Sequence, residues 1–447
     1  MDYAATTPMD MKVKKAMAPY FSAPPAGGFG NPGSLHFFGQ KAMTAVDESR
    51  EKIAKAINAD FREIIFTGSA TEANNLALRG VVKGFRFQIL GFSNKNQKYT
   101  LTPNTQNLTP QNLTPRIIVS AIEHDSILET CRDLEREEIE IIYLPVNKQG
   151  IIDLKKLKES LNERTVLVSI MCANNEIGIV QNIAGISKII KDFKKENFFS
   201  KYPLFHTDAV QAFQFLDCDV NKLGVDLMTL SAHKIYGPKG IGTLYINSKL
   251  QTPNYKQILN SKNKIQNKKT KIWDLGFGIW DLPVVKPLTT GGGQEFGLRS
   301  GTENVAAIVG FAKAIELVSN SRELENKRVR QLTDYFWREL KKLSPKAEIN
   351  GLKDLRFMIY DLRKLPNILN VYFPNQNSQD LLIKLDLNGI AVSSGSACSA
   401  RATKPSHVLK AIGLSDKKIK SSLRFSLGKF TTKEEINRAL KIIKKLF

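Results

Sequence analysis

Three residues with catalytic chemistry each follow a short run of Val, Ile and Leu. His124, Asp208 and Lys234 all lie within a few residues of the end of such a run. Lysine prefers solvent, and a lysine held among buried residues with a lowered pKa can form a Schiff base with a carbonyl compound. An aspartate in this position can bind a metal, cap a helix or pair with a protonated ring nitrogen. Each residue taken singly is a weak indication, because lone histidines and capping aspartates are most often structural.

A loop of small residues, TGSATEANN, precedes a predicted helix. Backbone N–H groups at a helix N-terminus, together with the Thr71 hydroxyl, can bind an anion such as phosphate. Capping of the helix by Ser69 or Thr71 is the simpler interpretation. A second Gly-rich segment, GGGQEFGLRSGTEN, contains Arg299, Ser300 and Thr302, which could add another phosphate contact.

The combination of these features is more specific than any one of them. It offers a phosphate cradle, a histidine that can stack on a ring, an aspartate for a pyridinium nitrogen and a lysine for an aldehyde. Pyridoxal 5'-phosphate (PLP) requires these four contacts. The motifs therefore favour a PLP-binding site.

A cysteine and an arginine near the C-terminus add a second kind of chemistry. Cys398 lies in SSGSACSARATKPS, close to Arg401 and Lys404. An exposed, electropositive loop of this kind favours the thiolate form of a cysteine. Arg424, in a β-rich run, could bind a substrate carboxylate through two parallel hydrogen bonds, although a surface arginine is the simpler interpretation without the cysteine loop. We interpret the other three cysteines as structural: Cys131, Cys172 and Cys218.

The predicted elements would bring these motifs to one place. Short β-rich runs alternate with amphipathic stretches from residue 64 to residue 246, which indicates a parallel, doubly wound sheet. Ligands of such sheets bind at the carboxyl ends of the strands. The runs are Ile64–Phe66, Ile117–Val119, Ile139–Leu144, Val166–Ile170, Leu204–His206, Leu227–Leu230 and Thr243–Ile246.

Two domains are predicted for the 447 residues. Residues 14–300 form a large ligand-binding domain, interrupted by polar surface inserts at about 85–115 and 249–286. Residues 1–13 and 301–447 form a smaller α+β domain, which carries the Cys398 loop.

Composition excludes several classes of protein. Hydrophobic residues make up 42% of the chain, so a disordered or fibrous protein is excluded. Four cysteines without a close pair argue against a disulfide framework or a self-contained zinc site. No targeting signal or 18-residue apolar run is present, so we expect a soluble cytoplasmic protein. The net charge of +22 would attract tRNA or an acidic partner, although a general lysine bias is the favoured explanation.

Many stretches of the chain resemble the NifS/IscS-like cysteine desulfurases, in the class V aminotransferase group of PLP enzymes. The resemblance runs from Asp2 to about residue 440 and is interrupted mainly by the two inserts. It implies a fold type I PLP-dependent transferase, with a mostly parallel seven-stranded sheet and a smaller α+β C-terminal domain. The stretches that carry it are DYAATTP, GNPGSLH, TGSATEANN, EHDSILETCRDLERE, GIIDL, NNEIG, HTDAVQ, SAHKIYGPKGIG, GGGQEFGLRSGT, PNILN, SSGSAC and RFSLG.

The resemblance also implies a role for each matching residue. Lys234 would bond the PLP aldehyde and move the substrate's α-proton, His124 would stack on the ring, and Asp208 would pair with its nitrogen. Cys398 would attack the sulfur of L-cysteine, leaving L-alanine and an enzyme persulfide. The other implied contacts are Gln211 and Asn175 on the ring hydroxyl or substrate; Ala70, Thr71, Ser231 and His233 on the phosphate; Thr302 on the phosphate of the other subunit of a homodimer; and Arg424 on the substrate carboxylate.

The implied sulfur acceptor is an iron–sulfur scaffold protein, a tRNA-thiolation protein or both. No intrinsic metal site is expected, although Cys398 could be a transient iron–sulfur ligand together with a scaffold. Two alternatives stay open at this point. A selenocysteine lyase or an aminotransferase would use the same lysine, but transamination needs no thiol at Cys398. A non-catalytic RNA-binding protein would explain the charge, but it would not need the catalytic set of residues.

Overall fold

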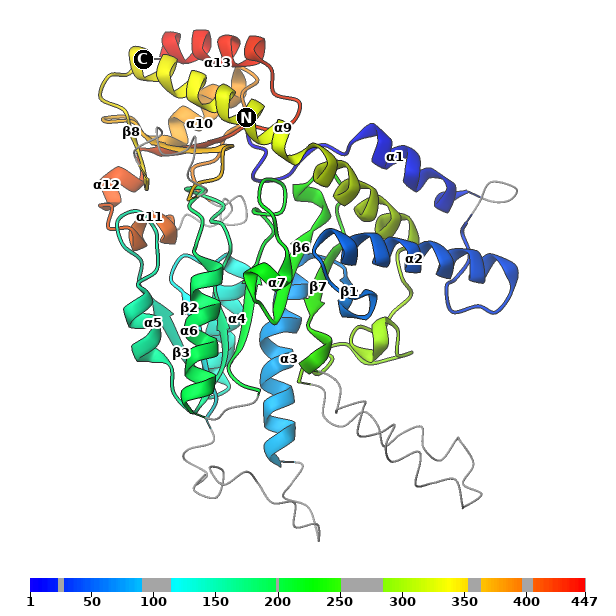
Figure 1. Cartoon of the computed structure of the whole chain (residues 1–447). Helices are drawn as coiled ribbons and strands as arrows, with labels where there is room; N and C mark the ends of the chain where they lie inside the picture. The colour runs from blue at the N-terminus through cyan, green and yellow to red at the C-terminus, as the bar shows by residue number, and fades with distance from the viewer. Residues whose placement is uncertain are drawn as a thin grey trace, which may run out of the picture.

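The computed structural model describes residues 1–22, 28–90, 114–197, 201–250, 284–352, 363–395 and 405–446 (Figure 1). Cys398 and most of both predicted inserts lie outside these ranges. Within them, two sheets and the helices packed on them form the molecule.

A seven-stranded sheet forms the centre of the larger part. Its order is β1-β7-β6-β5-β4-β2-β3, and β7 runs antiparallel to β1 and β6 whereas the other pairs are parallel. The mostly parallel sheet predicted from the sequence is therefore confirmed, with one strand in each of the seven runs. The strands are β1 (Ile64–Thr67), β2 (Arg116–Ser120), β3 (Glu140–Leu144), β4 (Thr165–Ser169), β5 (Leu204–Asp208), β6 (Leu227–Ser231) and β7 (Gly242–Ile246).

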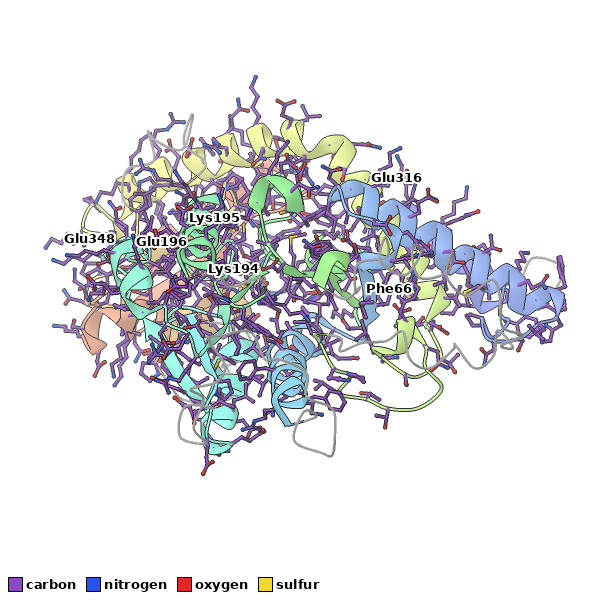
Figure 2. All side chains as sticks on the ribbon, turned by 60° about the horizontal axis from the view of Figure 1, so that its bottom comes forward. Phe66, Lys194, Lys195, Glu196, Glu316 and Glu348 are labelled. Carbon is purple, nitrogen blue, oxygen red and sulfur yellow. The ribbon has the colours of Figure 1, made fainter. Side chains whose placement is uncertain are left out.

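Helices cover both faces of this sheet, which explains why its strands are apolar nearly throughout. In β1, Ile65 packs with α3 (Ala70–Leu90) and α4 (Asp125–Arg136), whereas Ile64 and Phe66 face the other core. Phe66 is 3% exposed (Figure 2). The second core also contains residues of α5 (Leu154–Ser160) and α6 (Ile183–Glu196).

The last turn of α6 is basic and carries Lys194 and Lys195 (Figure 2). Positive charge there complements the negative end of the helix dipole. Lys194 also lies 3.7 Å from the carboxylate of Asp226, which directly precedes β6. This ion pair joins α6 to β6 at the end of the sheet where the parallel strands begin, opposite to their carboxyl ends.

A long helix, α9 (Val305–Leu343), joins the two parts of the molecule (Figure 1). It packs against α1 (Met11–Met17) and α2 (Phe37–Ala56), and further along against α13 (Lys433–Leu446) and the small sheet. That sheet is antiparallel and has the order β10-β9-β8. The remaining elements are α7 (Val220–Leu223), β8 (Glu348–Ile349), β9 (Ile368–Tyr372), α10 (Ser378–Leu387), α11 (His407–Ala411), α12 (Asp416–Ile419) and β10 (Ser422–Ser426).

The structure corrects both predicted inserts at their edges. Helix α3 continues to Leu90, so the first residues of the predicted 85–115 loop are helical. Val284 and Val285, at the end of the predicted 249–286 insert, are fully buried in the core that α3 covers. The boundary between the two predicted domains stays a prediction. Helix α2 has no counterpart among the elements predicted from the sequence.

Candidate active site

A cavity of about 150 Å³ lies at the carboxyl ends of the parallel strands, where the sequence predicted the ligand. It brings together residues from β5, from the turns after β4 and β6, and from the first turns of α3 and α4. The predicted site residues that line it are Ala70, Thr71, His124, Asn175, Asp208, Gln211, His233, Lys234 and Arg424.

Lys234 follows β6 in a short 3-10 helix, Ala232–Lys234, and reaches toward the N-terminal segment of the chain. Its Nζ donates hydrogen bonds to the carbonyl oxygens of Ala4 and Ala5, each at 2.7 Å. Gln211 Nε2 donates to the same Ala4 oxygen at 3.0 Å. Backbone carbonyl groups of the N-terminal segment thereby hold the amine in the cavity.

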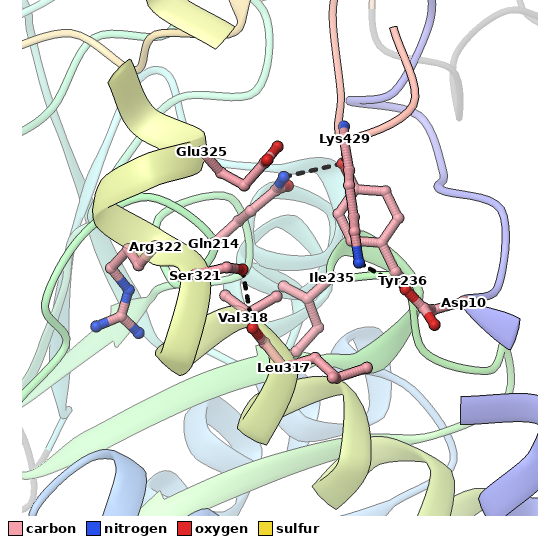
Figure 3. Close-up of a pocket in the computed structure, with 10 residues that line it drawn as sticks. All are labelled: Asp10, Gln214, Ile235, Tyr236, Leu317, Val318, Ser321, Arg322, Glu325 and Lys429. Carbon is pink, nitrogen blue, oxygen red and sulfur yellow. Dashed lines mark hydrogen bonds and ion pairs between the residues drawn. The ribbon is translucent and has the colours of Figure 1, made fainter. Parts of the chain in front are cut away.

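Hydrogen bonds to Tyr236 and an ion pair of Lys429 hold the turn that follows Lys234 (Figure 3). Tyr236 has a positive φ of 66°, and its N–H donates to Thr7 Oγ1 at 2.7 Å. Its hydroxyl accepts hydrogen bonds from Gln214 Nε2 at 3.0 Å and from the Lys429 N–H at 2.6 Å. Lys429 in turn pairs with Asp10 at 2.6 Å. These contacts hold the backbone after Lys234 and thereby fix the direction in which the Lys234 side chain leaves the sheet.

Asp208 ends β5 and is 5% exposed. Its Oδ2 accepts a hydrogen bond from Asn74 Nδ2 at 2.8 Å, and its Oδ1 accepts one from the Val210 N–H at 3.0 Å. Among the described residues it forms no ion pair. A buried carboxylate held by neutral donors favours a cationic partner in the cavity, and a protonated pyridine nitrogen is such a partner.

The same asparagine connects Asp208 to the predicted stacking histidine. Asn74 Nδ2 also donates to Ser126 Oγ at 2.8 Å, and that hydroxyl lies 2.9 Å from His124 Nδ1. The Ser126 N–H donates to the same nitrogen, so His124 caps α4 through Nδ1. Nδ1 thus acts as an acceptor, which leaves Nε2 as the ring nitrogen that carries a proton.

The phosphate cradle predicted at TGSATEANN is the first turn of α3. Ser69 Oγ accepts from the Glu72 N–H at 3.1 Å, so this serine caps the helix. Ala70 and Thr71 line the cavity with first-turn N–H groups, which have no partner within a helix. Gly242 of β7 lies behind the loop, and a Cβ there would be 2.6 Å from the Ser69 carbonyl carbon. Ser69 can therefore cap α3 while the N–H groups of the first turn remain able to bind an anion.

Burial favours the neutral form of two further side chains at the site. The pKa of His233 falls to about 4, mainly because of desolvation and also because of the neighbouring Lys234, so its ring is neutral at pH 7. Its Nδ1 lies 3.2 Å from Thr6 Oγ1. Glu123 is fully buried beside the site, and desolvation together with the negative charge of Asp208 raises its pKa well above the usual range. The carboxyl group of Glu123 therefore keeps its proton to a higher pH than an exposed glutamate does.

Arg424, on β10 of the small sheet, is 1% exposed. Its Nη1 donates to the Asn175 carbonyl oxygen at 2.9 Å. Its Nη2 pairs with Asp2 Oδ1 at 2.8 Å and donates to Ser393 Oγ at 3.1 Å. The predicted carboxylate-binding arginine is buried at the cavity, which the surface-residue alternative does not explain.

Two of the predicted site residues that the structure describes do not line the cavity. Ser231 ends β6 and is 4% exposed, next to the lining residues. Thr302 is exposed in the segment before α9. Cys398 lies outside the described residues, but the residues that flank its loop are anchored at the site. Ser393 contacts Arg424, and Ser406 Oγ donates to Glu176 Oε2 at 2.5 Å.

The sequence analysis missed several residues that shape the site. Asn74 connects Asp208 to His124 through Ser126, and Asp2 pairs with Arg424. The carbonyl groups of Ala4 and Ala5 hold the lysine. The DYAATTP and TGSATEANN motifs contain these residues, but backbone carbonyls and a buried asparagine give no distinctive signal in a single sequence.

The described part of the chain contains no cluster of three or more His, Cys, Asp or Glu residues that could hold a metal ion. In the same ranges, every helix is too short or too polar to cross a membrane. Cys131, Cys172 and Cys218 are buried free thiols, and burial raises the pKa of Cys131, which favours a structural role for it.

Comparison with known proteins agrees with this geometry. The family model for class V aminotransferases matches residues 1–88 and 100–439. A cysteine desulfurase IscS of Dictyoglomus turgidum is 40% identical over 446 residues, which cover 100% of this chain and 93% of that protein. A solved NifS-like protein superposes with a TM-score of 0.76 at 32% identity and covers 100% of this chain and 98% of its own.

A second solved structure, titled SspA in complex with cysteine, has a TM-score of 0.68 at 30% identity and covers 96% of this chain and 99% of that one. The first two of these relatives cover the whole chain, including the segments that build the cavity. The chain therefore belongs to the class V aminotransferase family, within its NifS/IscS-like group of cysteine desulfurases.

Proposed function

We propose that the protein is a PLP-dependent cysteine desulfurase, which converts L-cysteine to L-alanine and a persulfide on Cys398. The observation that carries the proposal is the single cavity lined by Lys234, Asp208, His124 and Arg424. The names of the relatives point to the same reaction. Transamination needs no thiol, whereas Ser393 and Ser406, which flank the Cys398 segment, contact Arg424 and Glu176.

The residues of the cavity fit PLP. Ala70, Thr71 and His233 would hold its phosphate together with Ser231, which lies next to the lining residues, and Asp208 would pair with the ring nitrogen. Lys234 would bond the aldehyde, His124 would stack on the ring, and Gln211 would contact the ring hydroxyl. When bound, PLP withdraws electrons from the substrate's Cα. The neutral His233 fits a phosphate oxygen as a hydrogen-bond donor rather than as a cation.

The protein's own residues would divide the remaining work. Arg424 binds the α-carboxylate of L-cysteine, with Asn175 beside it. Lys234 takes the proton from Cα and returns a proton to the product. The Cys398 thiolate forms a bond to the substrate's sulfur while the Cβ–S bond breaks, and Cβ gains a proton. L-cysteine and one enzyme thiol thus give L-alanine and one enzyme persulfide, with no other reactant.

The proposed destination of the sulfur is an iron–sulfur scaffold protein, a tRNA-thiolation protein or both. Cys398 would hold the persulfide and could also bind iron transiently while it docks to a scaffold. The proposed compartment is the cytoplasm, because a chain with only four cysteines, three of them buried free thiols, suits a reducing environment.

We also propose a homodimer in which Thr302 contacts the phosphate of the neighbouring subunit. Thr302 is exposed and does not line the cavity of its own chain. Several large apolar side chains are exposed around α1 and α2, where a second copy could cover them: Met11, Phe21, Leu35 and Phe37, with exposures of 72%, 70%, 90% and 71%.

The direct test is stoichiometric. Purified protein should be yellow and should release L-alanine from L-cysteine in the presence of a thiol reductant. Without reductant, one turnover should leave one persulfide per chain, and the alanine should match it. Pyruvate, or an amino-group transfer to a keto acid without persulfide, would instead identify an aminotransferase or a lyase.

A further inference from the structure

Asp2 contacts the buried arginine of the cavity. Its Oδ1 lies 2.8 Å from Arg424 Nη2, and the two side chains are 20% and 1% exposed. A buried guanidinium needs an anionic partner, and a charge-assisted hydrogen bond also restricts its orientation. The aspartate therefore helps to determine where the arginine's remaining N–H groups point.

Asp2 is itself fixed by contacts that do not involve a ligand. It forms an isolated β-bridge with Ser426, the last residue of β10. The Ser426 N–H donates to the Met1 carbonyl oxygen at 2.8 Å, and the Tyr3 N–H donates to the Ser426 carbonyl oxygen at 3.2 Å. Ser393 Oγ donates to Asp2 Oδ2 at 3.1 Å. Both carboxylate oxygens are therefore held next to β10.

Two roles are conceivable for a carboxylate beside this arginine. It could occupy the place of the substrate's carboxylate and be displaced, or it could support the arginine from behind. Among the described residues, Arg424 lines the cavity and Asp2 does not. The aspartate is thus outside the space that a ligand would fill, which favours support.

We propose that Asp2 is a positioning residue, which holds the Arg424 guanidinium toward the cavity so that it binds the α-carboxylate of L-cysteine. The inference rests on the substrate-binding role proposed for Arg424. Asp2 pairs with Arg424 and does not line the cavity, so its removal should weaken substrate binding and leave the chemical step largely unchanged.

The test measures equilibrium binding in a Cys398→Ser background, where turnover does not interfere. L-cysteine is titrated while the absorbance of bound PLP is followed. Asp2→Ala should raise the Kd about tenfold, the size expected for one charge-assisted hydrogen bond. Asp2→Asn keeps an oxygen acceptor for Nη2 and should raise the Kd by a smaller factor. Cysteamine, which lacks the carboxylate, should bind equally well to both variants and to the parent protein.

A double-mutant cycle separates this proposal from the one on which it rests. Arg424→Ala alone should weaken L-cysteine binding, and adding Asp2→Ala should have no further effect, because the aspartate acts through the arginine. A Kd that falls or stays constant in Asp2→Ala, or a loss of cysteamine binding, would overturn the positioning role. An unchanged Kd in Arg424→Ala would instead contradict the role of the arginine. Unchanged PLP absorbance and thermal midpoint confirm that each variant folds.

Discussion

At the scale of single residues, the site separates two kinds of chemistry. Lys234 is held by the carbonyl groups of Ala4 and Ala5 inside the cavity. Cys398 belongs to a loop whose flanking residues, Ser393 and Ser406, contact Arg424 and Glu176. The lysine would act on Cα of the substrate, and the cysteine would act on its sulfur. Replacing one should therefore spare the step that belongs to the other.

Lys234→Ala should no longer bond PLP covalently, because no other amine among the described residues lines the cavity. Borohydride treatment followed by mass spectrometry would detect the loss of the fixed cofactor. Release of alanine should fall at least about a thousandfold, because the proton at Cα has no base. Persistent fixation of PLP at this site would contradict the assignment.

Cys398→Ser should remain yellow and should still change its absorbance when L-cysteine is added. It should release almost no alanine and form no persulfide, since a serine hydroxyl is a poor nucleophile toward sulfur and stays protonated near neutral pH. Cys131→Ser is a matched control, because that thiol is buried and not part of the site. Substantial desulfuration by Cys398→Ser would show that another group attacks the sulfur.

At the scale of elements, the central strands hold polar groups that are neutral because they are buried. His206 in β5 is fully buried, with Nδ1 2.8 Å from Ser169 Oγ and Nε2 3.1 Å from Thr229 Oγ1. Desolvation lowers its pKa from 6.5 to about 3. The strands β4, β5 and β6 are thus joined by a neutral ring as well as by their backbones.

This histidine should make the protein sensitive to acid. Its folded-state pKa is depressed, so the unfolded chain binds a proton first, and stability is lost as pH falls from about 6.5 toward 3. Between pH 7 and pH 5, the protonation of His206 in the unfolded chain should reduce the free energy of unfolding by about 2 kcal/mol. His233, whose pKa is also lowered, should reduce it further. Urea denaturation at both pH values would measure it.

His206→Gln should be less stable at pH 7 and should show a smaller loss between the two pH values. His36→Asn is the matched control: His36 is exposed and caps α2, and asparagine also caps helices well. An equal pH dependence in the His206→Gln and wild-type proteins would show that another group causes the acid sensitivity.

At the scale of the whole molecule, α9 and the N-terminal segment connect the two sheets. Asp2 and Arg424 are 422 positions apart in sequence and form an ion pair. Thr7 Oγ1 donates to the His233 carbonyl oxygen at 2.9 Å, directly before the catalytic lysine. The first residues thus contact both the small sheet and the turn after β6. The proposed dimer would complete the site with a residue from a second chain.

Complementation between subunits tests the dimer and the role of Thr302 together. Thr302→Asp should weaken PLP binding, because its carboxylate would repel the phosphate of the neighbouring subunit. Coexpression of Thr302→Asp with Lys234→Ala should restore roughly a quarter of the wild-type sites, since each mixed dimer has one intact site. Light scattering should give the mass of two chains. An active monomer, or no recovery in mixed dimers, would contradict this arrangement.

Local patterns in the sequence determined most of the fold and pointed to several residues that line the cavity. Alternating apolar runs marked all seven strands of the large sheet, because a strand buried on both faces must be apolar along its length. His124, Asp208 and Lys234 follow strands, so a parallel sheet had to bring them to one edge. Family resemblance added the roles of residues such as Gln211, which chemistry alone left open.

Tertiary structure decided which groups support these residues. Nothing in the sequence around Asn74 indicates that it bridges Ser126 and Asp208, 52 and 134 positions away. The ion pair between Asp2 and Arg424 likewise depends on the first residues lying beside β10. The spacing of apolar residues indicates which face of a segment is buried. Contacts between distant segments depend instead on strand order and on the path of the chain. For this reason the sequence could predict that His124, Asp208 and Lys234 lie together, but it could not predict which residues orient them.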